Sequence, residues 1–310
     1  MRSAFAEQYT DDFYPSRTDT KSGFLERLDP VIYQCEPAGD YSLSPEQLEQ
    51  YERDGYLILK DYFSQETVGQ LRRELDRLCN DESIRELEGV ITEPDSKEIR
   101  SLFNLPDMSC IFDNISRSHK ILDNVMQILG GPVYLHQSRI NIKPAFKGRS
   151  FPWHSDFETW HVEDGLPRMR ALSCSVFLTQ NNSFNGPLFA IPGSHKYYLS
   201  CTGETPEQHF RRSLKKQVYG SPDNSLIKEL LKDTTIKGCF GNPGDMLIFD
   251  SNVLHGSPDN ISNLPRTNLF LAYNSCKNVP QKPYCGLDQR PVFLANRDYS
   301  PLAPIAWNNS

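Results

Sequence analysis

A histidine and an aspartate separated by one residue could bind a divalent metal ion. They are His154 and Asp156, in the run FPWHSDFETWH at residues 151–161. In an extended backbone, alternate side chains project to the same side, so the imidazole and the carboxylate would converge. Two ligands hold a divalent metal poorly, and His255, in the run FDSNVLHGS, is the candidate for a third. Two histidines and a carboxylate on one face of an octahedron leave three positions open, as in non-haem Fe(II) oxygenases.

The His-x-Asp pair alone is weak evidence for a metal. A histidine near an aspartate is more often a hydrogen-bonded pair on the surface or in the core. Arg266, which follows His255 closely, strengthens the metal interpretation. A strand after His255 would bring Arg266 back beside the metal, where its planar fork fits a carboxylate. A dicarboxylate that chelates the metal at one end, such as 2-oxoglutarate, would then be anchored at the other.

These residues resemble the ligand and co-substrate set of the phytanoyl-CoA dioxygenase family of Fe(II)/2-oxoglutarate enzymes. A longer match lies in FPWHSDFETWHVEDGLPRMRA at residues 151–171 and NGPLFAIPGSH at 185–195, which resemble the signature of the ectoine hydroxylases of this family. The resemblance spans residues 45 to 300, approximately, and implies Fe(II) on the two histidines and the aspartate, 2-oxoglutarate as co-substrate and O2 as oxidant. A motif of this length is far more specific than three metal ligands.

The resemblance implies a reaction, for which two alternatives are open. It implies hydroxylation of ectoine, a compatible solute, to 5-hydroxyectoine, with release of succinate and CO2. One alternative is a related 2-oxoglutarate oxygenase that hydroxylates another small amino acid or amine. The other is a barrel that binds a ligand or a metal without turnover, and the triad together with Arg266 argues against it.

A second segment that could contribute to the site carries a row of polar residues. The strand predicted over residues 133–142 alternates so that one face carries Gln137, Arg139, Asn141 and, just beyond it, Lys143. Without context, such a row is more often the solvated face of a sheet. Beside the metal ligands it would line the mouth of a barrel. The resemblance assigns Gln137 to the ectoine ring and Lys143 to 2-oxoglutarate, with Asn141 as a neighbour, and leaves Arg139 ambiguous.

The two bound molecules need different side chains. Ser257 and Lys143 are expected near the carboxylate of 2-oxoglutarate that meets Arg266. Ectoine is a cyclic amidine with a carboxylate, so its site should combine an aromatic face with a basic donor. Trp160 could supply the face and Arg290 the donor, and Phe151 could form a wall of the pocket. The alternatives are a core or rim tryptophan and a solvated arginine.

Short strands and helices must position these side chains. Strands are predicted over residues 56–63, 133–142, 170–179, 188–191, 244–249 and 267–274. Many short strands with Gly/Pro turns favour a mainly β fold with flanking helices, and the family resemblance implies a double-stranded β-helix, the cupin-like jelly-roll barrel. Helices are predicted from the caps Ser44 and Ser64 and over residues 118–129, with Gly55 and Gly130 as stops.

The chain divides into an arm and one domain. Residues 1–43 lack periodicity and predict an extended N-terminal arm, and residues 44–310 predict a single jelly-roll domain. A polar, partly helical insertion is expected near residues 202–238. His195 has no carboxylate at ligand spacing and the resemblance gives it no metal role, so it is interpreted as a loop or packing residue. The same interpretation is given to His119, His136, His161 and His209.

Composition excludes several classes of protein. The net charge of −7 and the absence of a basic run argue against a nucleic-acid partner. The eight cysteines contain no CxxC pair, which favours reduced thiols in a cytoplasmic protein. The sequence contains neither a signal-like segment nor a run of about 18 apolar residues, so neither secretion nor a membrane span is expected. The family resemblance implies a homodimer.

Overall fold

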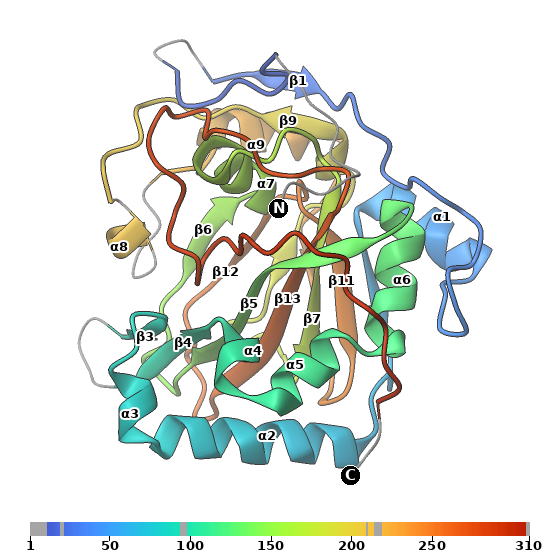
Figure 1. Cartoon of the computed structure of the whole chain (residues 1–310). Helices are drawn as coiled ribbons and strands as arrows, with labels where there is room; N and C mark the ends of the chain where they lie inside the picture. Colours follow the sequence, from blue (N-terminus) through green and yellow to red (C-terminus); the bar gives the residue numbers. More distant parts are fainter. Residues whose placement is uncertain (1–10, 19–21, 94–97, 209, 214–218, 308–310) are drawn as a thin grey trace.

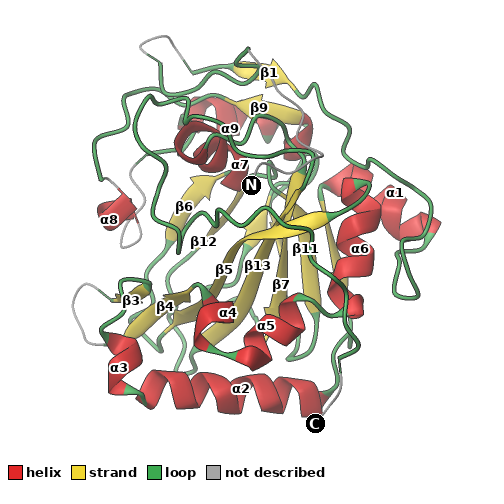
Figure 2. Ribbon diagram, viewed as in Figure 1, coloured by secondary structure: helices red, strands yellow, loops and turns green. Residues whose placement is uncertain are grey.

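The chain folds into a mainly β structure built on two antiparallel sheets (Figures 1 and 2). The computed structural model describes residues 11–18, 22–93, 98–208, 210–213 and 219–307. The larger sheet holds, in order, β2 (Tyr56–Leu59), β11 (Met246–Asp250), β7 (Ala171–Phe177), β13 (Arg266–Ser275), β5 (Val133–Lys143), β4 (Ile99–Phe103) and β3 (Val90–Thr92). The smaller sheet holds β10 (Lys237–Gly238), β8 (Phe189–Ala190), β12 (His255–Ser257) and β6 (Phe151–His154). A separate pair joins β1 (Phe24–Glu26) to β9 (Tyr197–Leu199).

The two sheets meet across an apolar cluster. Phe177, Phe249 and Phe270 of the larger sheet are buried together with Leu188 and Ala190 beside and on β8. Such facing sheets form a jelly-roll core. The prediction of a mainly β jelly-roll with flanking helices is confirmed, although the described strands form separate sheets and do not close into a continuous barrel.

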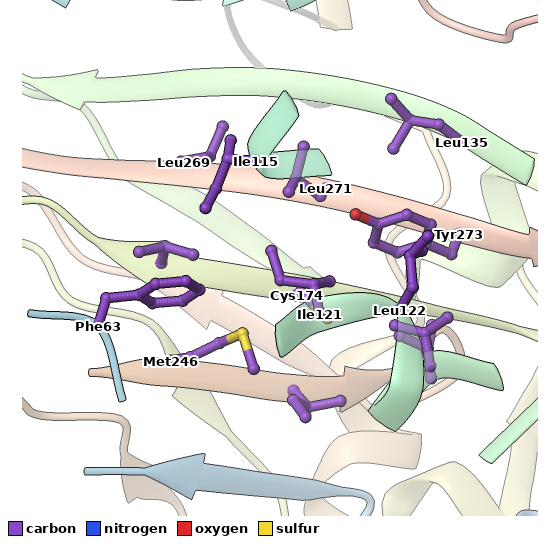
Figure 3. Close-up of a cluster of buried hydrophobic side chains, with 14 of the residues drawn as sticks. Phe63, Ile115, Ile121, Leu122, Leu135, Cys174, Met246, Leu269, Leu271 and Tyr273 are labelled. Atoms are coloured by element: carbon purple, nitrogen blue, oxygen red, sulfur yellow. The ribbon is translucent and has the colours of Figure 1, made fainter. Parts of the chain in front are cut away.

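Helices cover the outer face of the larger sheet. Figure 3 shows Leu269, Leu271 and Tyr273 of β13 among side chains that include Ile115 and Leu122 from two of these helices. The helices that contribute residues to this face are α1 (Pro45–Asp54), α2 (Gln65–Asn80), α3 (Glu82–Arg85), α4 (Leu105–Met108), α5 (Cys110–Ser116) and α6 (His119–Leu129). The other described helices are α7 (Asp156–Thr159), α8 (Phe210–Ser213) and α9 (Asn224–Leu230), with a π-helix at Trp160–Asp164 and a 3₁₀ turn at Ser194–Lys196. The outer face is therefore the main hydrophobic core, and the inner face is left for polar side chains.

The predicted helix boundaries follow from capping. The Ser44 side chain accepts a hydrogen bond from the Gln47 amide, and α1 ends at Gly55, whose φ of 79° is left-handed. Gly130 ends α6 in the same way, with a φ of 66°. The strand predicted over residues 56–63 is shorter than expected, because a turn follows Leu59 and Asp61 has a φ of 49°.

The pairing of β5 with β13 sets the polar inner face. Lys143 lies opposite Arg266, Asn141 opposite Asn268, and Arg139 opposite Phe270. Because alternate residues point to opposite faces, the residues between them, such as Ile140 opposite Leu269, turn toward the helices. The polar row predicted from the sequence is therefore the inward face of a buried sheet.

Residues 80–117, for which the sequence indicates no role, extend this sheet. They contain α3, α4 and α5 together with β3 and β4, and β4 pairs with β5 from Ser101 to Phe103. This segment therefore supports one side of the inner face.

Two simpler predictions concern thiols and membranes. All eight cysteines are free. In the part of the chain that the structure describes, the helices are too short or too polar to span a bilayer.

Candidate active site

The side chains of His154, Asp156 and His255 converge at one point. Their ligand atoms all lie within 4.8 Å of one another. The Nε2 atoms of His154 and His255 are each 3.8 Å from Oδ1 of Asp156. No other trio of histidine, cysteine or acidic side chains converges in this way among the described residues.

The backbone brings these ligands together in two steps. His154 on β6 and His255 on β12 are directly opposed partners in the smaller sheet. Asp156 does not continue the strand, as an extended backbone would require, but is the first residue of α7. Ser155 causes the change, because its side chain accepts a hydrogen bond from the Glu158 amide and caps the helix. The convergence predicted from an extended His-x-Asp therefore arises from a strand followed by a helical turn.

Hydrogen bonds orient both imidazoles. Nδ1 of His154 donates to the Pro152 carbonyl oxygen at 2.8 Å, and Nδ1 of His255 donates to that of Val253 at 3.1 Å. Each Nε2 is left with a lone pair directed at the shared point. Burial, with a smaller contribution from His255, lowers the pKa of His154 to about 3, so this imidazole is neutral at neutral pH. Two imidazoles and a carboxylate fit a divalent transition metal.

A buried arginine without an anionic partner lies near this group. Arg266 is 3% exposed, and its Nε and Nη2 donate to the Gly186 carbonyl oxygen at 3.2 and 3.0 Å. Its Nη1 donates to Asn141 Oδ1 at 3.0 Å. No described carboxylate lies within ion-pair distance, and burial, then the charges of Arg139 and Arg100, lowers the pKa of Arg266 to about 9. An uncompensated buried cation is costly, and an anionic ligand would compensate it.

A cavity borders the candidate metal site, and Lys143 lies behind its wall. Its Nζ donates to Ser257 Oγ at 2.7 Å and to the Pro258 carbonyl oxygen at 2.5 Å. Burial, together with the charges of Arg266 and Arg100, lowers the pKa of Lys143 to about 6. The cavity itself is lined by Arg266, Asn141 and Ser257 together with both metal-site histidines. The structure therefore brings three of the four predicted co-substrate residues to the cavity wall and places Lys143 against Ser257.

A second cavity also borders the candidate metal site. Its lining includes His154 and Asp156, and all four predicted substrate residues, Gln137, Phe151, Trp160 and Arg290. Trp160 is 4% exposed and packs edge-on against His136, with the ring centres 5.1 Å apart. Nε2 of Gln137 donates to the Leu294 carbonyl oxygen at 2.7 Å, which holds its side chain in the wall.

Comparison with known proteins assigns the chain to a family. Residues 51–268 match the phytanoyl-CoA dioxygenase family. The chain belongs to this family. It is 49% identical to an ectoine dioxygenase of Bordetella parapertussis over 286 residues, which cover 92% of each chain. An ectoine dioxygenase of Sphingopyxis alaskensis is 46% identical over 92% of this chain and 93% of its own.

A solved structure is closely similar to this chain over nearly its whole length. It is EctD from S. alaskensis with 2-oxoglutarate and 5-hydroxyectoine, with a TM-score of 0.87 and 41% identity, covering 97% of this chain and all of that one. The same protein with bound Fe gives a TM-score of 0.86. The similarity extends well beyond the range matched by the family.

Arg290 is bound within this phytanoyl-CoA dioxygenase fold in a way that the sequence did not indicate. Its Nε donates to Asp164 Oδ1 at 2.8 Å and its Nη2 to Oδ2 at 2.6 Å. Burial opposes the charge, but Asp164 and then Glu163 hold the pKa of Arg290 above its ordinary value. The side chain is 11% exposed, so the solvated-arginine interpretation is wrong.

Two further arginines border the cavities. Arg139, ambiguous in the sequence, lines both of them, and its guanidinium lies 4.9 Å from the centre of the Phe270 ring. Its place between Gln137 and Asn141 in the polar row was the available signal. Arg100, which sequence reasoning missed, lies 4.3 Å from the Phe151 ring centre and donates to Glu93. It comes from β4, whose position beside the site the sequence did not reveal.

The remaining histidines lie away from the metal ligands. Nδ1 of His161 donates to the Leu166 carbonyl oxygen at 2.7 Å, and its Nε2 lies 3.0 Å from Asp12 Oδ1. Nε2 of His195 lies 3.1 Å from the Glu52 carbonyl oxygen. His136 contacts Asp164, and His119 contacts Asp123. These contacts are those of packing histidines, whereas His209 lies outside the described residues.

Proposed function

We propose that this chain is an Fe(II)- and 2-oxoglutarate-dependent dioxygenase that hydroxylates ectoine to 5-hydroxyectoine and releases succinate and CO2. The observation that carries the proposal is the convergence of His154, Asp156 and His255 beside the unpaired cation of Arg266. The relatives named ectoine dioxygenases, and the similarity to EctD with 2-oxoglutarate and 5-hydroxyectoine, support the reaction and the substrate.

Fe(II) would be held by His154, Asp156 and His255. A bound Fe(II) with open coordination positions supplies the activation of O2, driven by oxidation of 2-oxoglutarate. The protein fixes the ligand set through the backbone carbonyls that accept from the two Nδ1 atoms. Ser173 Oγ donates to Asp156 Oδ2 at 3.3 Å and leaves Oδ1 toward the histidines.

The co-substrate would be bound through its two carboxylates. Arg266 would meet the carboxylate farther from the metal, because a dicarboxylate compensates the buried charge. Ser257 and Asn141, which line the same cavity, would add hydrogen bonds. Lys143 would act through Ser257, to which it already donates.

Ectoine would occupy the second cavity. The ring of Trp160 would face the delocalised amidinium, and Phe151 would form the adjoining wall. Gln137 would hydrogen-bond the ring through the amide oxygen that its contact with Leu294 leaves available. The ectoine carboxylate would be met by Arg290, or by Arg139, which has no described ion-pair partner and reaches both cavities. No side chain needs to act as a base, so the protein's task is to place the carbon that is hydroxylated and exclude water.

One experiment tests reaction and substrate together. The purified protein is incubated with Fe(II), 2-oxoglutarate and ectoine, with and without air, and the solute is analysed by mass spectrometry. A gain of one oxygen atom only in air, with succinate formed in equal amount, is the expected result. Succinate formed only with another small amino acid or amine would favour the related oxygenase. A protein that binds metal and 2-oxoglutarate but consumes no oxygen with any candidate would favour binding without turnover.

Three further proposals concern the whole protein. We propose that the protein is cytoplasmic. We also propose that it is a homodimer, which sedimentation of the purified chain would test. Exposed apolar side chains on three neighbouring loops, Phe146, Phe184, Ile261 and Leu264, offer a contact surface for the second subunit. We further propose that the chain divides into an arm, residues 1–43, and one domain, residues 44–310, with an insertion near residues 202–238. Limited proteolysis would test this division.

A further inference from the structure

We propose that Arg17, on the N-terminal arm, is a positioning residue for the substrate cavity. It links Glu158 and Glu163, the two carboxylates on either side of Trp160, and so fixes the segment that faces the substrate. The inference rests on the function proposed above and extends it to a part of the chain with no predicted role.

The guanidinium of Arg17 is buried between these carboxylates. It donates from Nε to Glu158 Oε1 at 3.0 Å and from Nη2 to Oε2 at 2.8 Å. Its Nη1 donates to Glu163 Oε1 at 2.6 Å and to Thr205 Oγ1 at 2.9 Å. Burial disfavours the charge, but the two carboxylates outweigh it and raise the pKa of Arg17 above its ordinary value. Breaking such a network leaves buried charges uncompensated and is strongly destabilising.

The spacing of the two carboxylates matches the unusual helix between them. In an α-helix, residues five apart point about 140° away from each other. The segment Trp160–Asp164 is instead a π-helix, whose wider turn brings residues five apart closer to one side. Glu158 lies in α7 and Glu163 in the π-helix that follows directly, so the guanidinium of Arg17 bridges the junction between the two.

The segment that Arg17 holds is a wall of the substrate cavity. Thr159, Trp160 and Glu163 all line that cavity together with Asp156. Glu163 Oε2 also lies 3.9 Å from Nε of Arg290, which is already bound by Asp164. Without Arg17, Glu163 would be drawn toward Arg290 and would compete with Asp164 for it. Both the aromatic face and the basic donor for ectoine would then be displaced.

The arm is held in place by several contacts around Arg17. The Arg17 amide donates to the Cys201 carbonyl oxygen, and the Cys201 amide donates to Ser16 Oγ, both at 2.8 Å. Arg17 adopts a left-handed φ of 54°, which costs energy in a residue with a side chain. Three residues away, Tyr14 packs edge-on against Phe157, with ring centres 5.3 Å apart. The surrounding structure therefore fixes a strained backbone in order to deliver this side chain.

Gly220 closes the network from the other side. A Cβ there would lie 2.6 Å from Glu158 Oε2, 2.9 Å from Arg17 Nη2 and 3.1 Å from Thr159 Oγ1. Only glycine fits, and its neighbour Tyr219 lines the substrate cavity. The ion pair is thus enclosed on one side by the segment with Thr159 and Glu163 and on the other by the segment with Tyr219, both of which line the substrate cavity.

Arg17→Gln tests the proposal, with Arg53→Gln as the matched control that removes an exposed ion pair from α1. We expect Arg17→Gln to raise the KM for ectoine at least tenfold and to increase the succinate formed per 5-hydroxyectoine. The KM for 2-oxoglutarate should stay within about twofold of wild type. Arg17→Lys, which keeps the charge but loses the bidentate contact, should give an intermediate KM. Unchanged ectoine KM and coupling, or an equal loss for both substrates, would overturn the proposal.

A second readout does not depend on turnover. With Trp153 and Trp307 replaced by phenylalanine, the fluorescence of Trp160 should shift to the red in Arg17→Gln as water reaches the ring. Where Arg17→Gln does not fold, two milder variants replace it: Ser16→Ala removes the hydrogen bond from Ser16 Oγ to Glu158 and the one that the Cys201 amide donates to Ser16 Oγ, and Thr205→Val removes the one from Arg17 Nη1. A rise of two- to threefold in ectoine KM is expected from each, and no rise in either overturns the inference. A wild-type protein that leaves ectoine unchanged would refute the proposed function, whereas an active wild type with unaltered Arg17 variants refutes only this inference. In an inactive protein, an unshifted Trp160 emission would refute the positioning role by itself.

Discussion

Lys143 and Arg266 are directly opposed partners on neighbouring antiparallel strands, so two basic side chains face each other inside the fold. Like charges in this position destabilise a sheet. Burial, and after it the charges of Arg266 and Arg100, lowers the pKa of Lys143 to about 6, so that Lys143 is mostly neutral at neutral pH and the repulsion is weakened. An anion of two negative charges would remove the repulsion altogether, and the pair therefore prepares the site for a dicarboxylate.

Binding of 2-oxoglutarate should take up a proton. Lys143 has a pKa of about 6 in the free protein, so it is mostly neutral at pH 7.5. A bound dianion favours the charged form and raises this pKa, so affinity should be highest below pH 6 and fall as pH rises above it. Calorimetry in buffers of different ionisation enthalpy measures the proton directly. Lys143→Met is the control and should abolish this uptake, and equal uptake in that variant would assign the proton elsewhere.

Replacing Arg266 should separate stability from co-substrate binding. Arg266→Met removes an uncompensated buried cation, so the melting temperature of the ligand-free protein should rise. The same change should raise the KM for 2-oxoglutarate by tenfold or more, in line with about 1.5–3 kcal/mol for a hydrogen bond to a charged group. Thermal melts with and without 2-oxoglutarate, together with kinetics, measure both effects. A lower melting temperature without ligand would contradict the charge argument.

His255→Ala should remove the metal. Loss of one of three ligands is expected to abolish both metal-dependent stabilisation and hydroxylation, because two ligands bind a divalent ion weakly. Titration of the metal-free protein with Fe(II) under nitrogen, followed by thermal melting, measures binding apart from activity. His119→Ala changes a half-exposed histidine outside the site and should behave as wild type. A metal-induced shift that survives in His255→Ala would mean that another ligand set holds the ion.

Replacing Trp160 should affect the KM for the substrate and not the KM for the co-substrate. Trp160→Ala is expected to raise the KM for ectoine by roughly tenfold or more through loss of the cation–π contact and the packing, and Trp160→Phe by less. The KM for 2-oxoglutarate should change little, since Trp160 does not line that cavity. Steady-state kinetics with each compound varied in turn provide the measurement. A larger effect on 2-oxoglutarate than on ectoine would place the two molecules the other way round.

Local patterns in the sequence were sufficient for much of this architecture. The caps Ser44 and Gly55 bound a helix because they satisfy backbone groups within a few residues. The alternation along β5 placed Gln137 and Lys143 on one face for the same local reason.

Other features depend on contacts between distant segments. Asp164 binds Arg290 only because the chain returns to the π-helix more than a hundred residues later. The insertion of Arg17 between Glu158 and Glu163 likewise joins the arm to a segment far along the chain. Even locally, Ser155 could serve as a strand residue or a helix cap, and the amide of Glu158 decides between them. Sequence periodicity carries no information on such partners.

The register of β5 against β13 restricts how this catalyst could be redesigned. Deleting one residue from either strand would exchange its two faces, sending guanidinium groups into the layer of leucines beneath the helices. Ectoine and 2-oxoglutarate would both lose binding groups, since the paired strands β5 and β13 contribute residues to both cavities. Attempts to broaden the range of accepted solutes therefore have more freedom in the loop that carries Arg290 and Leu294, where insertions leave the ladder intact.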